Sequence, residues 1–156
     1  MLQTGDSAPA FSLPDADMEI VNLEDFVGEK NVVLYFYPKD DTPGCTQEAV
    51  EFSGLDQEFE NLDAVVFGIS RDDCISHADF RDKHGLTVRL LADTDGEVCE
   101  QYDVWREKEK DGHKSMGILR STFIIDKQGV IRDAEYGVSV QGHARDVMQR
   151  LGGLVA

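Results

Sequence analysis

Cysteine is scarce in this sequence, and the usual pairing patterns of cysteine are absent. The chain has three cysteines, Cys45, Cys74 and Cys99, and no Cys-x-x-Cys segment. An odd, small number of cysteines does not suit a disulfide scaffold, and none of them stands with the four histidines at the spacing of zinc ligands. We therefore expect no metal and no cofactor, and we expect redox or nucleophilic chemistry at one or two of the thiols.

Long hydrophobic runs and a targeting leader are missing too. No apolar segment approaches the length of a membrane span, and Met1 does not open a basic, apolar and small-residue leader. We therefore expect a cytoplasmic protein. The 156 residues contain no internal repeat, low-complexity segment or linker, which predicts a single domain over residues 1–156.

Basic residues are few. The chain has 15 Lys and Arg against 31 Asp and Glu, which gives a net charge of −16 at pH 7. Nucleic acids and anionic membranes bind to basic surfaces, so we expect neither as a partner. We interpret the acidic excess as a source of solubility. It also means that a thiolate in this protein needs a local source of positive potential.

The segment of residues 38–48 carries the strongest chemical signal. It follows an apolar, strand-like run and leads into a helical pattern, with Thr42 suited to the N-cap and Pro43 to the first helical position. Cys45 then lies in the first turn, where unpaired backbone N–H groups and the positive end of the helix dipole meet. A thiol there is shifted toward the nucleophilic thiolate. The alternative is a small buried cysteine without reactivity.

Hydrophobic periodicity predicts the remaining elements. An edge strand and its hairpin partner are expected at residues 8–15 and 20–23, central strands at 32–37, 64–70 and 88–92, helices at 45–60, 74–83, 95–102 and 141–151, and a C-terminal hairpin at 121–126 and 130–135. Residues 106–115 are expected to form a charged surface loop, and Gly152-Gly153 to stop the last helix. His77 is expected to pack or to face solvent rather than to act in catalysis.

The order of these elements predicts an α/β protein with a thioredoxin-like fold. Right-handed crossovers place helices on both faces of a central mixed sheet, and the first hairpin is an N-terminal extension. Parallel strands end at the edge where ligands bind in open α/β sheets. If strand 121–126 runs antiparallel beside strand 32–37, Arg120 lies next to Cys45.

Arg120 would supply the positive potential that Cys45 needs. An unperturbed thiol with a pKa of about 8.5 is only about 3% thiolate at pH 7. A helix terminus contributes at most about 2 kcal/mol, whereas a nearby guanidinium lowers a pKa by about one to three units. The two together suffice. The alternative for Arg120 is a surface arginine at the start of a strand.

These residues resemble a known active-site motif. Pro38-x-x-x-Thr42-x-x-Cys45, with Arg120 in Arg-Ser-Thr-Phe, is similar to the motif of the peroxiredoxins. Further segments resemble the bacterioferritin comigratory protein (PrxQ) branch of that family: Gly5-x-x-Ala8-Pro9-x-Phe11, residues 35–46, Ser70-Arg71-Asp72 and Trp105-x-Glu107-Lys108. The resemblance implies a thiol-dependent peroxidase that reduces hydrogen peroxide and small organic hydroperoxides. Its cysteine becomes a sulfenic acid, and thioredoxin or another thiol regenerates it.

The resemblance also implies roles for the neighbours of Cys45. Arg120, the Thr42 hydroxyl and the backbone N–H groups of Gly44 and Cys45 would stabilise negative charge on the departing oxygen. Pro38 would shield the thiolate from water. Glu48 would orient Arg120, with a solvated helix residue as the alternative. A monomer is expected, and a dimer is the alternative.

The resolving step is open at this point. The two positions where members of the branch carry a second cysteine hold Val50 and Arg81. An external thiol, Cys74 at the start of its helix, or Cys99 in a short helix could resolve the sulfenic acid. A disulfide needs Cα atoms within about 7 Å, so a bridge to Cys74 would require unwinding of the first helix turn. The alternative function is a redox-sensing or client-binding module that uses Cys45 as an oxidisable switch.

Overall fold

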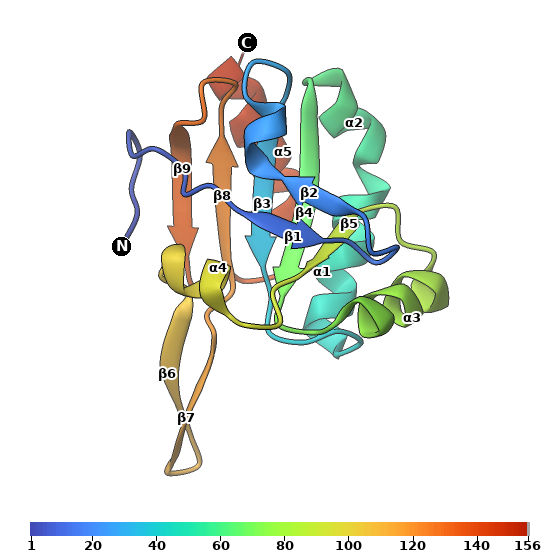
Figure 1. Ribbon diagram of the computed structural model, residues 1–156, viewed down its shortest axis with the longest axis vertical. Helices are drawn as coiled ribbons and strands as arrows, with labels where there is room; N and C mark the ends of the chain where they lie inside the picture. The colour runs from blue at the N-terminus through green and yellow to red at the C-terminus, as the bar shows by residue number, and fades with distance from the viewer. Residues whose placement is uncertain (156) are drawn as a thin grey trace.

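A five-stranded mixed sheet forms the centre of the computed structural model, which describes residues 1–155 (Figure 1). The strand order is β5-β4-β3-β8-β9. The strands are β3 (Asn31–Phe36), β4 (Ala64–Ser70), β5 (Arg89–Ala92), β8 (Ser121–Ile125) and β9 (Ile131–Tyr136). β3, β4 and β5 are parallel, and β8 runs antiparallel to both β3 and β9. The predicted mixed sheet is confirmed.

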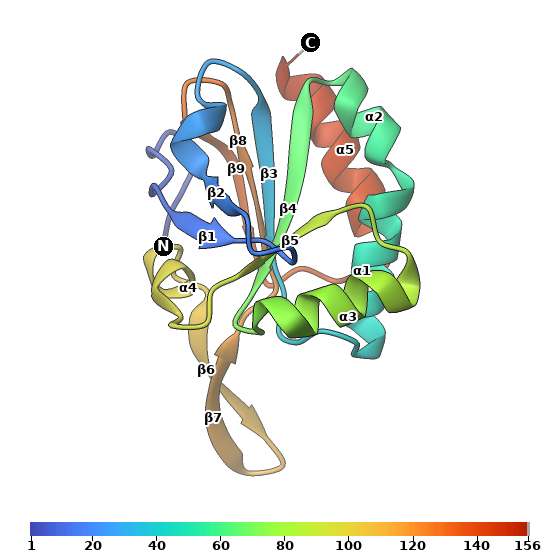
Figure 2. The same ribbon diagram turned by 45° about the vertical axis from the view of Figure 1, so that its right-hand side comes forward.

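Helices cover one face of the sheet (Figure 2). They are α1 (Pro43–Gly54), α2 (Asp56–Asn61), α3 (Cys74–His84) and α5 (His143–Val155). Val33 and Tyr35 of β3 point to this side and pack with Phe52, Phe80 and Leu151. The single helix expected at residues 45–60 is wrong, because the chain kinks at Leu55, whose amide bonds the carbonyls of Phe52 and Ser53 instead of continuing the α-helical ladder.

The last helix runs past Gly152-Gly153, where the sequence predicted its end. Leu151 is fully buried before the glycines, and Leu154 packs against the same hydrophobic cluster after them. A Cβ atom on Gly152 would lie 3.9 Å from the methyl groups of Leu62, so α5 passes close to the end of α2. Packing of this apolar stripe outweighs the cost of about 1 kcal/mol for each glycine in a helix. The predicted stop was therefore wrong.

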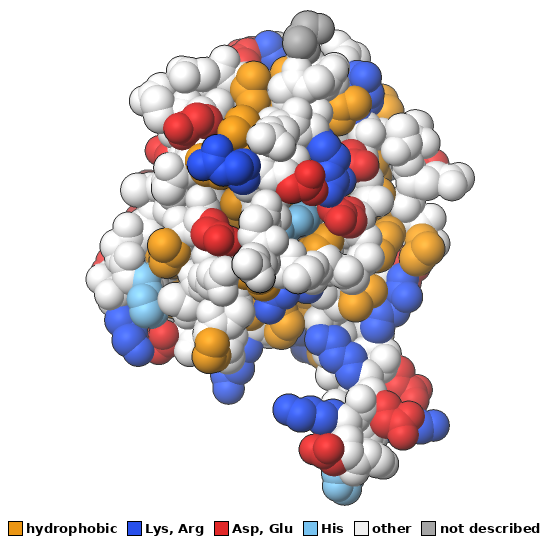
Figure 3. Space-filling model, turned by 180° about the vertical axis from the view of Figure 1, so that it is seen from behind, with side chains coloured by type: hydrophobic (Ala, Val, Ile, Leu, Met, Phe, Trp, Pro, Cys, Tyr) orange, Lys and Arg blue, Asp and Glu red, His pale blue; other side chains and the backbone are white. Residues whose placement is uncertain are grey.

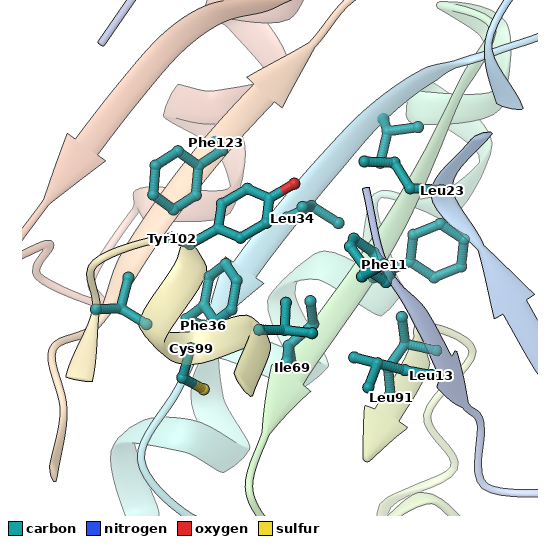
Figure 4. Close-up of a cluster of buried hydrophobic side chains, with 14 of the residues drawn as sticks. Phe11, Leu13, Leu23, Leu34, Phe36, Ile69, Leu91, Cys99, Tyr102 and Phe123 are labelled. Carbon is teal, nitrogen blue, oxygen red and sulfur yellow. The ribbon is translucent and has the colours of Figure 1, made fainter. Parts of the chain in front are cut away.

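The opposite face carries the N-terminal extension and one short helix (Figure 2). The elements are β1 (Ser12–Pro14), β2 (Ile20–Asn22), the 3₁₀ helix η1 (Leu23–Phe26) and α4 (Glu97–Gln101). Side chains alternate across a strand, so Leu34 and Phe36 of β3 face this side and pack with Phe11, Tyr102 and Phe123 (Figure 4). The predicted hairpin extension and the helices on both faces are confirmed.

A two-stranded ribbon projects from the sheet edge where β3 and β4 end (Figure 1). It consists of β6 (Trp105–Lys110) and β7 (His113–Ile118), which pair antiparallel. The expected charged loop was therefore wrong. The tip residues Asp111 and Gly112 both have positive φ, at 53° and 78°, as in the two-residue turns that match the twist of a hairpin. Because β6 is mostly charged and β7 has only Met116 and Ile118 as large apolar residues, the apolar pattern of a strand was missing from the sequence.

The two hydrophobic clusters lie on opposite faces of the same sheet and draw on residues from Phe11 to Leu151. The single-domain organisation over residues 1–156 stays a prediction.

Within residues 1–155, no helix combines the length and the apolar character needed to cross a membrane.

Candidate active site

The thiol of Cys45 lies at the start of α1, beside the start of β8. The register of β3 and β8 pairs Phe36 with Ser121, which brings the residue before β8 to the carboxyl end of β3. Arg120 donates a hydrogen bond from Nη2 to Cys45 Sγ over 3.2 Å. Cys45 is only 2% exposed. The structure thus brings Arg120 to Cys45 as the strand order predicted.

Glu48 holds the other side of the same guanidinium. Arg120 Nη1 donates to Glu48 Oε1 over 2.6 Å, and Glu48 is 1% exposed. Burial raises the pKa of Glu48 to about 7, although the positive charge of Arg120 acts in the opposite direction. Its second oxygen, Oε2, has no hydrogen-bond partner among the described residues. Near neutral pH, Glu48 therefore offsets only part of the charge of Arg120, and it lies in the core rather than in solvent.

The loop before α1 places the other candidates. Thr42 occupies the N-cap with extended backbone, but its hydroxyl donates to the carbonyl of Lys39 over 2.8 Å and does not cap the helix. Thr42 is therefore the N-cap residue, as predicted, although its side chain makes no hydrogen bond to the helix. The Thr42 oxygen keeps its lone pairs for a donor such as a peroxide O–H. A Cβ on Gly44 would lie 3.4 Å from Arg120 Nη2, so glycine leaves room for the guanidinium. Pro38 is exposed on the same loop.

A buried polar network fixes this loop from behind. Asp40 accepts hydrogen bonds from Tyr37 Oη over 2.6 Å and from Ser76 Oγ over 2.8 Å, and its carboxyl group is hydrogen-bonded with His77 Nδ1 over 2.7 Å. The other ring nitrogen of His77 donates to the carbonyl of Leu91 over 2.9 Å. His77 is fully buried, so it packs in the core, as one of the two expected alternatives. Sequence reasoning missed its link to Asp40, because the two partners lie on separate elements, α3 and the loop after β3.

We expect His77→Ala to destabilise the fold by about 3–5 kcal/mol, because it leaves the Asp40 carboxylate buried without its ring partner. Chemical denaturation of the variant measures this loss. His84→Ala is the matched control on the same helix: His84 bonds Asp41 at the surface, so the change is expected below about 1 kcal/mol. Adding Asp40→Asn to His77→Ala should recover part of the stability. Equal midpoints for His77→Ala and the wild type would contradict this account.

Among residues 1–155, potential metal ligands come together in two groups, Asp40 with Asp72 and His77, and Glu135 with His143 and Asp146. In the first group, both ring nitrogens of His77 are already hydrogen-bonded. In the second group, Arg150 forms ion pairs with Glu135 and Asp146. Protein partners thus engage the ligand atoms in each group, and we assign no metal to either.

The other two cysteines lie apart from this arrangement. Cys99 is fully buried in the cluster on the opposite face of the sheet (Figure 4), and burial raises the pKa of its thiol far above the ordinary value. Cys74 begins α3 as expected and is half-buried. Burial raises the pKa of Cys74 too, and the carboxylates of Asp73 and Asp15 raise it further. At both thiols the pKa is thus raised, which disfavours the thiolate.

The chain was compared with known proteins once the geometry around Cys45 and Arg120 was established. The sequence profile of the AhpC/TSA family matches residues 4–134. The chain belongs to the AhpC/TSA family. Over 150 residues, this peroxiredoxin is 45% identical to the putative peroxiredoxin Bcp of Coxiella burnetii, covering 96% of this chain and 99% of that one. It is 43% identical to peroxiredoxin Bcp of Bacillus subtilis, covering 96% and 95% of the two chains.

Solved structures of the PrxQ branch share the fold. A cysteine-to-serine variant of PrxQ from Xylella fastidiosa matches this peroxiredoxin with a TM-score of 0.94 and 36% identity, covering 100% of this chain and 99% of that one. A bacterioferritin comigratory protein from Xanthomonas campestris matches with a TM-score of 0.89 and 36% identity, covering 94% and 92%. The predicted thioredoxin-like fold is confirmed, and the chain is a thiol-dependent peroxidase with a peroxide substrate and a thiol reductant. The redox-sensing alternative is not favoured.

Proposed function

We propose that Cys45 is the residue of this peroxiredoxin that reacts with peroxide. The observation that carries the proposal is the hydrogen bond of 3.2 Å from Arg120 Nη2 to Cys45 Sγ, in the first turn of α1. A hydrogen bond from a cation favours the anionic form of the sulfur. The guanidinium of Arg120 thus supplies the local positive charge that a thiolate needs in a chain with a net charge of −16.

The proposed reaction is a displacement at oxygen. The sulfur of Cys45 attacks one peroxide oxygen, an S–O bond forms, the O–O bond breaks, and the departing oxygen takes a proton to leave as water or an alcohol. Arg120 and the N–H groups of Gly44 and Cys45, which come before the first i→i−4 bond of α1, are in place to stabilise charge on that oxygen. Thr42 would accept a hydrogen bond from the peroxide, and Pro38 would shield the thiolate at the loop.

We propose hydrogen peroxide and small organic hydroperoxides as substrates. Support for the organic class comes from the Xanthomonas campestris protein, whose structural description reports alkyl peroxide reduction activity. By the same likeness to bacterial relatives, we propose a cytoplasmic, single-domain monomer over residues 1–156, with a dimer as the alternative. The acidic surface argues against nucleic acid and anionic membranes as partners.

We propose that an external thiol, such as that of thioredoxin, resolves the sulfenic acid. Attack on the oxidised sulfur needs a thiolate. The carboxylates of Asp73 and Asp15 disfavour a thiolate at Cys74, and burial disfavours it at Cys99. Neither internal thiol is therefore prepared for this step.

Mass mapping under non-reducing conditions after one equivalent of peroxide tests both parts of the proposal. We expect a trapped sulfenic acid on Cys45, and we expect Cys74→Ser and Cys99→Ser to keep turnover with an external thiol within about twofold of the wild type, because neither thiol enters the cycle. A disulfide between Cys45 and Cys74 would overturn the external-thiol step and leave the role of Cys45 intact. An unmodified Cys45 would overturn the assignment itself.

A further inference from the structure

The projecting β6–β7 ribbon carries a row of cations on one face. Alternate residues of β6 point to the same side, so Arg106, Lys108 and Lys110 share a face. Their partners across the ribbon are Gly117, Ser115 and His113. Figure 3 shows basic and acidic side chains gathered on this projection. The chain has about twice as many acids as bases, so a row of three cations on one face of the ribbon is unusual in it.

Lys108 does not extend into solvent like the other lysines of the ribbon. It is half-buried and lies flat across Gly117: a Cβ on that glycine would be 3.2 Å from Lys108 Cδ, 3.4 Å from Cε and 3.6 Å from Nζ. The side chain therefore leans toward the base of the ribbon, where the chain continues into Arg120 and β8. Burial lowers the pKa of Lys108, the charge of Arg120 lowers it further, and the charge of Cys45 raises it. Lys108 is thus within electrostatic reach of both groups.

The ammonium of Lys108 has no ion-pair partner within residues 1–155. By contrast, Arg106 pairs with Asp103, and Lys114 pairs with Glu107. Lys108 also lines an open cavity of about 330 Å³ together with Pro38 of the active-site loop and Arg71.

Among the described residues, four ionisable or charged groups bear on the electrostatics of the Cys45 sulfur, and Arg120 is the one in direct contact with it. Arg120 donates to it from the start of β8, and Glu48 of α1 offsets part of that charge. Tyr35 of β3 is neutral, because burial and the charges of Glu48 and Cys45 raise its pKa well above the ordinary value. Lys108 of β6 is the fourth group, and it is a cation without a neutralising partner in the described chain.

We propose that Lys108 is a positioning residue of the peroxidase reaction: its ammonium, held over Gly117, adds positive potential at the Cys45 thiolate that Arg120, partly neutralised by Glu48, does not supply alone. The proposal rests on the proposed role of Cys45. It also gives a reason for the glycine at position 117, because a Cβ there would press against the Lys108 side chain, and a larger side chain would push the lysine aside.

The experiment compares Lys108→Met with Lys110→Met, its exposed neighbour on the same face. The rate constant with hydrogen peroxide is measured against pH. We expect the midpoint of the profile to move up by about half a pH unit in Lys108→Met, and the rate below the midpoint to fall about threefold. Lys110→Met should follow the wild type. Lys108→Arg should restore the profile, and added salt should reduce the difference between Lys108→Met and the wild type.

Gly117→Val keeps the net charge and displaces the lysine, so it should reproduce the shift of Lys108→Met. A profile of Lys108→Met that coincides with that of Lys110→Met would overturn the proposal, and so would a wild-type profile for Gly117→Val. If Cys45 is not the residue that reacts with peroxide, the result is different. Peroxide consumption then persists in Cys45→Ser, both with lysine and with methionine at position 108.

Discussion

Replacing Cys45 by serine is expected to abolish peroxide consumption, with a loss of rate constant on the order of a thousandfold or more. The serine hydroxyl fits the same space and can still accept the hydrogen bond from Arg120. It does not ionise near neutral pH, however, so the nucleophile is lost while the surrounding geometry is kept. Stopped-flow consumption of hydrogen peroxide measures the effect.

Cys74→Ser is the matched control for this substitution, because it makes the same chemical change at the first residue of α3. Thermal unfolding of both variants should stay close to that of the wild type. Consumption of peroxide by Cys45→Ser at the wild-type rate would contradict the assignment of Cys45.

Arg120→Met is expected to lower the rate constant with hydrogen peroxide about 100- to 1000-fold, the usual cost of removing one donor aimed at a developing anion. The substitution removes the hydrogen bond to Cys45 and also leaves Glu48 buried beside the sulfur without its partner. Arg120→Lys should give an intermediate rate, because a single ammonium does not replace the fork that contacts Glu48 and Cys45 together.

The double variant Arg120→Met with Glu48→Gln separates the loss of the hydrogen bond to Cys45 from the effect of leaving Glu48 without its partner. It removes the unpaired carboxylate, so it should recover stability lost in Arg120→Met, while most of the loss in rate should persist. Peroxide consumption by Arg120→Met within about threefold of the wild type would contradict a role for the guanidinium in the reaction.

The sequence contained enough information to place the Cys45 thiol next to the Arg120 guanidinium. Residues 32–37 form an apolar run, because β3 is buried on both faces. The order of strands and helices then placed β8 antiparallel beside β3, which brought Arg120 to Cys45 across 75 residues of chain. The strand order and the predicted start of the helix at residue 43 were sufficient to predict that Arg120 lies next to Cys45.

Other features depend on tertiary contacts that no local pattern shows. The burial of Glu48 follows from the packing of α1 against the sheet, and the link between His77 and Asp40 joins α3 to a distant loop. The continuation of α5 through Gly152-Gly153 depends on the packing of Leu151 and Leu154 against the hydrophobic cluster. The β6–β7 ribbon has few apolar residues, so hydrophobic alternation could not reveal it.

The near-complete burial of the Cys45 sulfur has a consequence for the two halves of the catalytic cycle. Hydrogen peroxide has two heavy atoms and fits where a protein surface cannot follow. The external thiol proposed above would have to reach the oxidised sulfur itself, so its attack would require the start of α1 to open. On this proposal, the oxidant and the reductant are separated by size, and regeneration depends on a local motion of the polypeptide.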